Sequence, residues 1–494
     1  MLQRAGHTAY FAGGCVRDQL LGIEAKDYDI ATSAGPDEVQ RLFPGRATGL
    51  VGKSFGVVRV GSGEEWFEVA MFRQEGPYLD GRRPESVRPA TPEEDAQRRD
   101  FTINGLFFDP IADRLIDYVG GEADLRAGII RAIGDPAARF AEDHLRLLRA
   151  IRFAARLRFT IEPKTWDAIR AGAALIRTVS ADRIRDELNR IFTVDKPERG
   201  LDLLDKSGLL AEVLPDIAAL HGVDQPPQFH PEGDVYEHTR LMLTKIQNPD
   251  LELALSILFH DVGKKPTAKE DENGRIRFNE HESVGAEMAE RIMTALRYDN
   301  KTIHVVRELV QHHMQFKDVP HMRESTLKKM MARPNFDKEL ELHRIDCDSS
   351  HGDLQHWEYL KRLLETTPPE EIDPPPLITG HDLIAMGVPP GKTIGRILEE
   401  VKNAQLEGTV QTRYEALALA RKLAARGMDT LPLPLPPPPK KEPEKKEPGK
   451  APEETPERPA ENSSTGPDAP EKPPDDSPGG EAPGDEPPGS KPPK

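Results

Sequence analysis

The spacing of apolar residues changes along this chain, and the change predicts where strands give way to helices. Short apolar runs rich in β-branched and aromatic residues occur early, at 28–32 (YDIAT) and 66–72 (WFEVAMF), and they predict strands. From 138 to 220 the apolar residues recur at steps of three or four, which predicts helices throughout. The pattern therefore predicts an α/β head followed by a helical region.

Proline- and glycine-rich stretches at 221–234 and 368–376 divide the rest of the chain. From 431 onward, 21 of the chain's 46 prolines fall within 64 residues, beside dense charge. Such a tail cannot bury enough apolar surface to offset its ordering entropy, so we expect it to be disordered. The expected segments are an α/β head at 1–137, a helical neck at 138–222, an all-helical domain at 223–365, a small helical module at 366–430 and a disordered tail at 431–494.

Composition indicates how many domains, which cysteine chemistry and which cellular compartment to expect. At 494 residues the chain is too long for a single core, which predicts several domains. Its two cysteines, Cys15 and Cys347, lie far apart and predict neither a disulfide framework nor a disulfide-linked partner. There is no signal peptide and no apolar run of about 18 residues. We therefore expect a cytoplasmic protein with no membrane-spanning segment.

A net charge of −17 is unusual for a protein that binds nucleic acid, because cation–phosphate contacts dominate the affinity for RNA. The charge is unevenly distributed, however. Residues 126–199 hold 16 lysines and arginines against 10 acidic residues. This basic segment favours RNA binding, although a solvated helix face would have a similar composition.

Two carboxylates one residue apart follow closely on a glycine turn. Because side chains alternate faces along a strand, Asp27 and Asp29 are expected to project together into one site. Paired carboxylates repel each other unless a cation lies between them, and all-oxygen ligands suit Mg²⁺. Upstream, Gly13 and Gly14 permit close approach to a ligand, and Arg17 offers donors suited to phosphate. The combination predicts a metal–nucleotide site, whereas each part alone would be typical of a surface turn.

Asp143, Arg146 and Arg149 recur at three-residue steps in a predicted helix, so we expect them along one stripe. A carboxylate only accepts hydrogen bonds and a guanidinium only donates them, which matches the amino donor and ring-nitrogen acceptor of cytosine and adenine. Uracil and guanine present the opposite order and would leave partners unpaired, at about 1–3 kcal/mol each. The stripe therefore predicts selection of C and A, with a salt-bridged surface helix as the alternative.

Several motifs occur in a highly specific order: GGCVRD at 13–18, DYD at 27–29, RRDFTIN at 98–104, DYVGGEADLRAGIIR at 117–131 and EDHLR at 142–146. With these motifs, from about residue 9 to residue 200, the chain resembles the class II tRNA nucleotidyltransferases, or CCA-adding enzymes. Their superfamily includes DNA polymerase β and bacterial poly(A) polymerases. The resemblance implies a multidomain α+β fold, in which a DNA polymerase β-like nucleotidyltransferase α/β head precedes all-α neck, HD and tail domains.

The same resemblance implies roles for individual residues. Asp27 and Asp29 would hold two Mg²⁺ ions, and Glu68 stands where a third catalytic carboxylate is expected, with an ordinary exposed strand glutamate as the alternative. The other residues would bind the nucleotide: Gly13, Gly14 and Arg17 at the triphosphate, Arg99 and Asp100 at ribose and phosphates, Asp143 and Arg146 at the base, and Arg149 and Arg152 around the nucleotide.

Histidines and aspartates follow the neck in a second series. Histidine and carboxylate are ligands of borderline metals, and an apolar helix that ends in His-Asp-x-Gly-Lys is hard to explain by core packing alone. Over about 225–365 the series resembles the HD superfamily of metal-dependent phosphohydrolases, which implies a divalent transition metal. A metal kept only for structure would require the same residues. The implied core ligands are His238, His260, Asp261 and Asp346, with His281 and His312 as candidates for a second metal.

By resemblance, the expected activity is template-independent addition of C, C and A from CTP and ATP to the 3′ end of tRNA, with HD phosphohydrolase activity beside it. A poly(A) polymerase, or an enzyme that adds only A or only CC, is the alternative within the same chemistry. The alternative from another class is an HD phosphohydrolase with a regulatory nucleotide-binding head. Relatives carry more residues before the first strand, so we expect the natural start to lie upstream of Met1.

Overall fold

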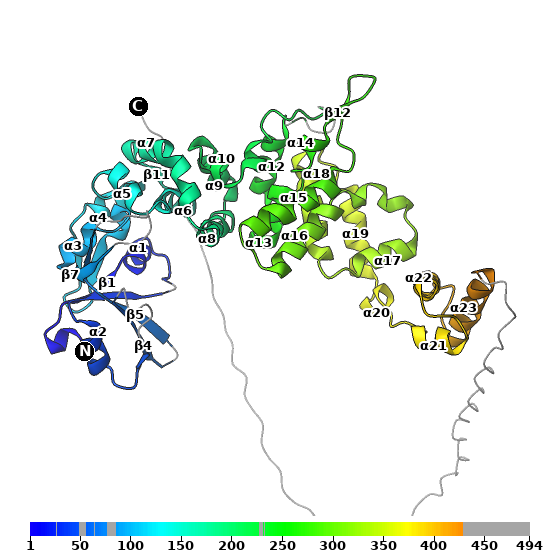
Figure 1. Ribbon diagram of the computed structural model, residues 1–494, viewed down its shortest axis with the longest axis horizontal. Helices are drawn as coiled ribbons and strands as arrows, with labels where there is room; N and C mark the ends of the chain where they lie inside the picture. Colours follow the sequence, from blue (N-terminus) through cyan, green and yellow to red (C-terminus); the bar gives the residue numbers. More distant parts are fainter. Residues whose placement is uncertain are drawn as a thin grey trace, which may run out of the picture. The chain divides into compact units, whose positions relative to one another are not determined.

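The computed structural model describes residues 1–25, 27–48, 56–63, 65–76, 85–226, 231 and 233–427, and the predicted tail at 431–494 lies outside them. Strands dominate the first part of the chain and helices the remainder (Figure 1). Among the helices of the described ranges, none is long and apolar enough to cross a membrane. The two cysteines are buried free thiols in separate elements.

The head is built on a mixed sheet with the strand order β3-β4-β5-β2-β1-β8-β9. Strand β2 pairs antiparallel with β1 and parallel with β5, so Asp29 at the start of β2 lies opposite Glu68. Both predicted early strands are present, as β2 and β5. The strands of this sheet are β1 (Ala9–Ala12), β2 (Asp29–Thr32), β3 (Ala47–Thr48), β4 (Val57–Ser62), β5 (Glu65–Met71), β8 (Leu106–Asp109) and β9 (Arg114–Asp117).

Short helices and strand pairs surround this sheet. Helix α2 packs on one face, where Val39 meets the buried valines of β4 and β5. The head elements outside the sheet are α1 (Gly14–Leu20), α2 (Pro36–Leu42), α3 (Pro92–Gln97), α4 (Gly121–Ala127), β6 (Arg73–Glu75), β7 (Val87–Pro89), β10 (Ile129–Ile130) and the 3₁₀ turns Gln3–Ala5 and Thr102–Asn104.

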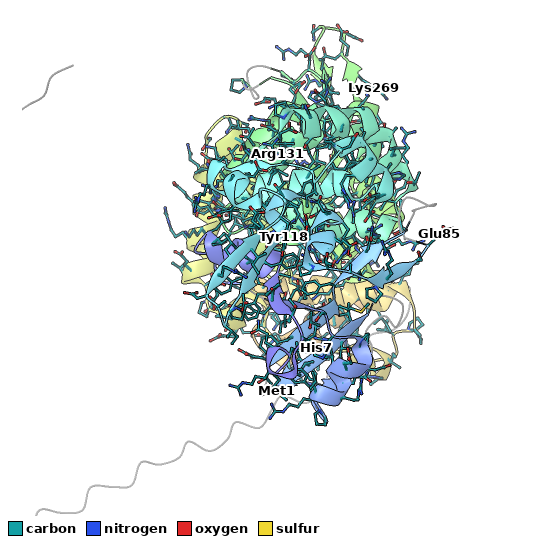
Figure 2. The ribbon with its side chains drawn as sticks, turned by 90° about the vertical axis from the view of Figure 1, so that its left-hand side faces the viewer. Met1, His7, Glu85, Tyr118, Arg131 and Lys269 are labelled. Atoms are coloured by element: carbon teal, nitrogen blue, oxygen red, sulfur yellow. The ribbon has the colours of Figure 1, made fainter. Side chains whose placement is uncertain are left out.

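The neck is helical with one exception. Strand β11 (Thr160–Ile161) pairs in parallel with β10, so the region predicted to be helical throughout contains a short strand that joins it to the head. Arg131, labelled in Figure 2, reinforces this junction. Its Nε donates to Asp124 at 2.9 Å, and its Nη1 lies 3.5 Å from Glu162. The neck elements are α5 (Pro136–Glu142), α6 (Arg146–Leu157), α7 (Pro163–Gly172), the 3₁₀ helix Ala173–Thr178, α8 (Ala181–Phe192), α9 (Pro197–Lys206), α10 (Leu209–Val213) and α11 (Pro215–Ala218).

A buried apolar core continues from the neck into the helices that follow, and it includes Leu188, Leu255 and Leu309. Residues 377–427 form a smaller core of their own around Leu383 and Val401. The helices of this region are α12 (Val235–Lys245), α13 (Leu251–Phe259), α14 (Lys264–Thr267), α15 (His281–Ala295), α16 (Asn300–His312), α17 (Glu324–Met331), α18 (Phe336–Ser349), α19 (Gln355–Thr366), α20 (Pro369–Ile372), α21 (Gly380–Ala385), α22 (Lys392–Leu406) and α23 (Arg413–Gly427), with a 3₁₀ helix at Gln315–His321 and the strands β12 (Lys269–Glu270) and β13 (Ile276–Arg277).

Candidate active site and metal centre

A pocket of about 1080 Å³ between the head and the neck brings the predicted residues together. Among the described residues, ten arginines and seven carboxylates line it, an excess of cations that suits a triphosphate. Of the residues predicted for the head and neck site, Glu68 alone is not in its lining. Those that line the pocket are Gly13, Gly14, Arg17, Asp27, Asp29, Arg99, Asp100, Asp143, Arg146, Arg149 and Arg152.

The paired carboxylates stand where β2 begins. Burial raises the pKa of Asp29, the neighbouring carboxylate of Glu68 raises it further, Arg99 opposes this effect, and Asp27 adds to it. Glu68 belongs to the same face of the sheet, because it is the register partner of Asp29 on β5. Carboxylates crowded in this way fit a divalent cation, which would relieve their mutual repulsion.

Position 13 requires a glycine, because of its backbone conformation and because of the side chain packed against it. Gly13 has a φ of +72°, and a Cβ at this position would lie 2.7 Å from Nη1 of Arg99. Arg17 follows on α1 and is buried. Its Nη1 donates to Oδ1 of Asn104 at 2.6 Å, and its Nε donates to Asp18 at 2.8 Å. The turn and the motif at 98–104 therefore form one wall of the pocket.

Asp100 ties this wall to the neck helix α6. Nε of Arg149 donates to its Oδ2 at 2.8 Å, and the Asn104 amide donates to its Oδ1 at 2.9 Å. Burial would by itself raise the pKa of Asp100, but the attraction of Arg149 and these hydrogen bonds hold that pKa well below its usual range. Burial lowers the pKa of Arg152 to about 10, and Glu187 opposes that shift from 3.2 Å. Both arginines are therefore charged at neutral pH.

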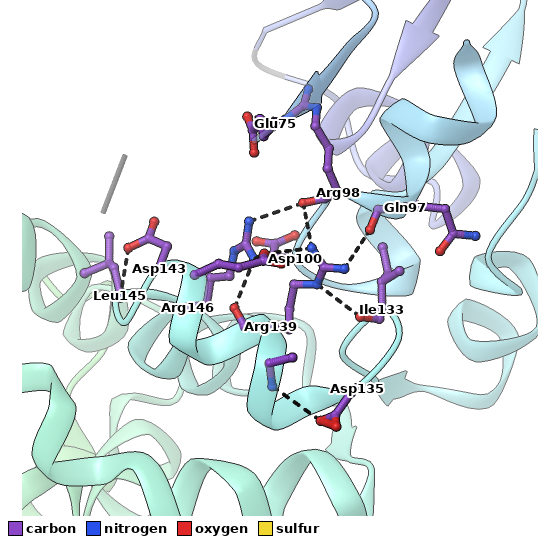
Figure 3. Close-up of polar contacts among 12 residues, drawn as sticks. Glu75, Gln97, Arg98, Asp100, Ile133, Asp135, Arg139, Asp143, Leu145 and Arg146 are labelled. Carbon is purple, nitrogen blue, oxygen red and sulfur yellow. Dashed lines mark hydrogen bonds and ion pairs between the residues drawn. The ribbon is translucent and has the colours of Figure 1, made fainter. Parts of the chain in front are cut away.

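Asp143 and Arg146 line the pocket, but the prediction that Asp143 lies on one helical stripe with Arg146 and Arg149 was wrong. Helix α5 ends at Glu142 and α6 begins at Arg146, and Asp143 between them is extended, with φ −140° and ψ 105°. Its carboxylate accepts from the N–H of Leu145 at 3.1 Å (Figure 3). A side chain that binds the local backbone in this way competes with helix continuation, which explains the break.

Arg146 holds the two halves of the pocket together. Its Nη2 donates to the carbonyl of Arg98 at 3.2 Å, and its Nη1 donates to that of Arg139 at 3.0 Å (Figure 3). Arg139 in turn donates to the carbonyl of Gln97 at 2.8 Å. Arginines of the neck thus donate hydrogen bonds to backbone carbonyls at the start of the 98–104 motif.

Sequence reasoning missed Arg183, which lies on α8 and also lines the pocket. Its Nη2 donates to both carboxylate oxygens of Asp143, at 2.8 and 3.2 Å. Its Nη1 is buried and has no hydrogen-bond partner among the described residues. Forty residues separate this pair, so no local pattern could have revealed it. Asn104 was missed as well, although it closes a motif that was recognised.

Comparison with known proteins agrees with this architecture. Family models match the chain as the poly A polymerase head domain at 9–131, the RNA and SrmB-binding site of polymerase A at 158–220 and tRNA nucleotidyltransferase domain 2 at 281–420. The A-adding tRNA nucleotidyltransferase of Deinococcus radiodurans is 31% identical over 438 residues, 84% of this chain and 95% of that protein. The CCA-adding enzyme of Levilactobacillus brevis is 33% identical over 420 residues, 85% of this chain and 94% of that protein.

Solved structures of known enzymes match the fold of this chain as well. The crystal structure of the Bacillus stearothermophilus CCA-adding enzyme in complex with CTP matches with a TM-score of 0.66 and 26% identity, over 86% of this chain and 96% of that one. The chain belongs to the class II CCA-adding enzyme family. It is therefore a tRNA nucleotidyltransferase with a nucleotidyltransferase head and a helical body.

In this tRNA nucleotidyltransferase, a second group of polar side chains lies buried among the helices after the neck. Two sets of potential ligand atoms share Asp261: one with His238 and His260, the other with His281 and His313. Asp346 on α18 joins the first set, with Oδ1 3.1 Å from Nε2 of His238. The residues arrive from α12, the ends of α13 and α16, the start of α15, and α18.

Hydrogen bonds fix how three of these histidines are protonated. Nδ1 of His260, His281 and His313 lies 2.8, 2.8 and 2.6 Å from a backbone carbonyl, which can only accept. Nδ1 must therefore carry the proton, and each Nε2 presents a lone pair toward the cluster. The Nε2 atoms of His281 and His313 are only 3.2 Å apart. Two facing lone pairs at that distance, with Asp261 beside them, fit a divalent metal.

The structure places His313 in this cluster, whereas the sequence pattern predicts His312. Consecutive residues at a helix end point in directions about 100° apart, so both cannot face the same site. Nδ1 of His312 instead pairs with the buried carboxylate of Glu339 at 3.1 Å. The predicted position, His312, is therefore wrong by one residue.

Proposed function

We propose that this nucleotidyltransferase adds C, C and A from CTP and ATP to the 3′ end of tRNA. The observation that carries the proposal is the single pocket in which Asp27 and Asp29 of the head meet arginines of the neck. The named activity of the Levilactobacillus relative supports it, and that of the Deinococcus relative supports the addition of A. Mg²⁺ held by Asp27, Asp29 and Glu68 would activate the 3′-hydroxyl of the RNA and neutralise charge on the departing pyrophosphate.

We assign the other residues of the pocket to binding different parts of the nucleotide. We assign Arg17 and Arg99, beside Gly13 and Gly14, to the triphosphate, because a buried and a half-buried guanidinium group line the pocket where the glycine backbone lets a ligand approach closely. We assign Asp100 to the ribose, and Arg149 and Arg152 to holding the nucleotide against the neck. Asp143 and Arg146 then read the base edge, as an acceptor and a donor whose order matches cytosine and adenine.

The test is to incubate the purified protein and Mg²⁺ with tRNA that lacks its CCA end, supplying each nucleotide singly and then CTP with ATP. We expect C, C and A to be added and the reaction then to stop. Incorporation of A only onto tRNA ending in CC would restrict the protein to the named activity of the Deinococcus relative. Long A tails would indicate a poly(A) polymerase, and no incorporation would overturn the proposal.

A second activity is favoured by the histidine cluster. We propose that His238, His260, Asp261, His281, His313 and Asp346 form an HD-type site for a divalent transition metal, in place of the set that included His312. Burial lowers the pKa of His313 to about 3, and the neighbouring histidines contribute, so this imidazole is neutral at working pH. Neutral imidazoles and carboxylates at such a site support hydrolysis of cyclic or terminal phosphate esters.

His312→Gln and His313→Gln form a matched pair for testing this site. We expect Mn²⁺ to raise the melting temperature of the natural protein and of His312→Gln, in which an amide N–H can still donate to Glu339. The same metal should stabilise His313→Gln much less, because a ligand has been lost. Hydrolysis of a 2′,3′-cyclic nucleotide, measured alongside, would distinguish a catalytic metal from a structural one. Equal stabilisation of both variants would contradict the ligand assignment.

A further inference from the structure

An exposed tryptophan stands on the same face of the head sheet as the catalytic carboxylates. In the register of the sheet, Glu68 on β5 lies opposite Asp29 on β2 and opposite Arg59 on β4. Trp66 precedes Glu68 by two residues on β5, and side chains two residues apart share a face. Asp29, Glu68, Arg59 and Trp66 therefore all project from one side of the sheet.

Burial along the two strands agrees with this assignment. Val58, Val60 and Val69, which alternate with these residues, are buried at 0%, 5% and 2% exposure. They pack on the opposite face with α2. Trp66, by contrast, is 47% exposed, which makes it one of the most exposed large apolar side chains in the described part of the chain. Core packing therefore does not account for a tryptophan at this position.

The ring is held in a defined place. Gly61 is its cross-strand partner, and a Cβ on Gly61 would lie 3.3 Å from the ring, so the indole lies against the bare backbone of β4. The guanidinium carbon of Arg59 is 5.6 Å from the ring centroid, within the range of a cation–π contact. An aromatic surface beside a cation is the combination that binds single-stranded nucleic acid, through base stacking and phosphate contact.

The strand order places this pair on a particular side of the carboxylates. In the sheet, β2 lies between β5 and β1, and β1 leads into the glycine turn and Arg17. The nucleotide pocket includes Asp27, Asp29 and Arg17, but neither Trp66 nor Arg59 is in its lining. The carboxylates thus have the nucleotide pocket on one side and the tryptophan on the other. The reaction needs the RNA 3′ end on the side that the incoming nucleotide does not occupy.

We propose that Trp66 and Arg59 form the binding platform for the 3′-terminal nucleotides of the RNA primer. The indole stacks on a terminal base, and Arg59 contacts the adjacent phosphate, so that the 3′-hydroxyl points at Asp27 and Asp29. Two residues along β5 span about 7 Å, which keeps the platform within one nucleotide of the catalytic carboxylates. This inference rests on the proposed nucleotidyl transfer and adds the site of its second substrate.

The first test compares Trp66→Ala with Trp66→Phe. We expect the alanine variant to raise the dissociation constant and KM for tRNA lacking CCA on the order of ten-fold, with the KM for CTP unchanged. Phenylalanine retains a stacking face and should restore most of the affinity. Trp357→Phe is the matched control, because Trp357 forms a similar pair with Lys361, at 4.8 Å, on α19 outside the head. Thermal melting of each variant excludes misfolding as the cause.

The second test removes the cation. Arg59→Ala should reduce the slope of log affinity for RNA against log salt by about 0.7, the value for one phosphate contact on a single strand, and Arg59→Lys should preserve the slope. Unchanged RNA affinity in Trp66→Ala, or a rise only in the KM for CTP, would overturn the platform. RNA affinity is measured as equilibrium binding, which does not require the protein to be catalytically active. Failure of the proposed activity would instead appear as absent incorporation by the natural protein.

Discussion

At the residue scale, the pocket depends on carboxylates whose partners come from distant parts of the chain. Asp143 is the clearest case: a break between α5 and α6 turns it toward the pocket, and Arg183 holds both of its oxygens. Its position is therefore set by a helix 40 residues away. A group that reads a base edge must be held in one orientation, because a mobile carboxylate would accept the wrong donor equally well.

Removing either partner should therefore weaken nucleotide choice more than rate. We expect Asp143→Ala to use UTP and GTP more readily, with the discrimination measured as the ratio of kcat/KM for CTP to that for UTP falling about ten-fold or more. Arg183→Ala should produce a smaller change in the same direction, since Asp143 remains but is less firmly held. If both variants are slower yet retain the natural ratio, the base-reading assignment fails.

At the element scale, helix α6 joins the neck to the head through ionic contacts as well as through a shared apolar core, in which Phe153 packs against Phe101. Arg149 of α6 binds Asp100, and Arg156 of the same helix binds Asp18, which in turn binds Arg17. Asp100 is 7% exposed, so its charge depends on these partners. The helix that would contact the nucleotide is also the helix that keeps the head residues in place.

Arg149→Ala should lower stability in a manner that depends on pH. Loss of a partner leaves the buried charge of Asp100 uncompensated, at a cost of about 3 kcal/mol. The pKa of Asp100 is depressed in the folded protein, so the stabilisation is fully present above its unfolded pKa of about 4 and is lost progressively as pH falls from that value through the lower folded pKa. The difference in melting temperature from the natural protein should therefore be large at pH 7 and shrink toward pH 3.

Arg170→Ala is a suitable control for this experiment, because Arg170 is exposed on α7 of the same neck. It should melt within a degree or two of the natural protein at every pH. A deficit in Arg149→Ala that stays constant from pH 7 to pH 3 would contradict the role assigned to the pair with Asp100.

At the scale of the whole molecule, one chain holds both the nucleotide pocket and the histidine cluster for which we propose a second phosphate chemistry. The pocket is lined by aspartates and arginines of the head and neck, whereas the second cluster consists of histidines and aspartates of α12 to α18. Within the described residues the two sets have no member in common. A continuous apolar core nevertheless runs through the neck into the helices of the cluster. The two sites thus use different residues but are connected through one apolar core.

Separate chemistry predicts that each site can be disabled alone. We expect Asp29→Asn to abolish nucleotide addition and to retain stabilisation by Mn²⁺, because the cluster is untouched. His313→Gln should behave in the opposite way, with addition of C, C and A close to that of the natural protein. Primer extension and thermal melting with and without Mn²⁺ check both. Loss of both properties in either variant would mean that the common core couples the sites.

Much of the site could be predicted from the sequence because its residues cluster in short motifs. A glycine turn and two carboxylates one residue apart specify local geometry, so Gly13, Arg17, Asp27 and Asp29 were identifiable without tertiary information. Strands β2 and β5 were likewise predicted, since short apolar runs rich in β-branched and aromatic residues favour strands. The choice of carboxylate and imidazole groups at the second site was also evident from the residues themselves.

Tertiary structure alone decided which side chains meet. It broke the expected helix at Asp143, brought Arg183 to that carboxylate, and turned His313 rather than His312 toward Asp261. It also paired β5 with β2 and β4, which brings Trp66 and Arg59 to the face of the sheet that carries Asp29. The physical reason is the same in each case: composition and periodicity determine which groups are available and which face they prefer, but contacts between distant segments depend on how helices and strands pack.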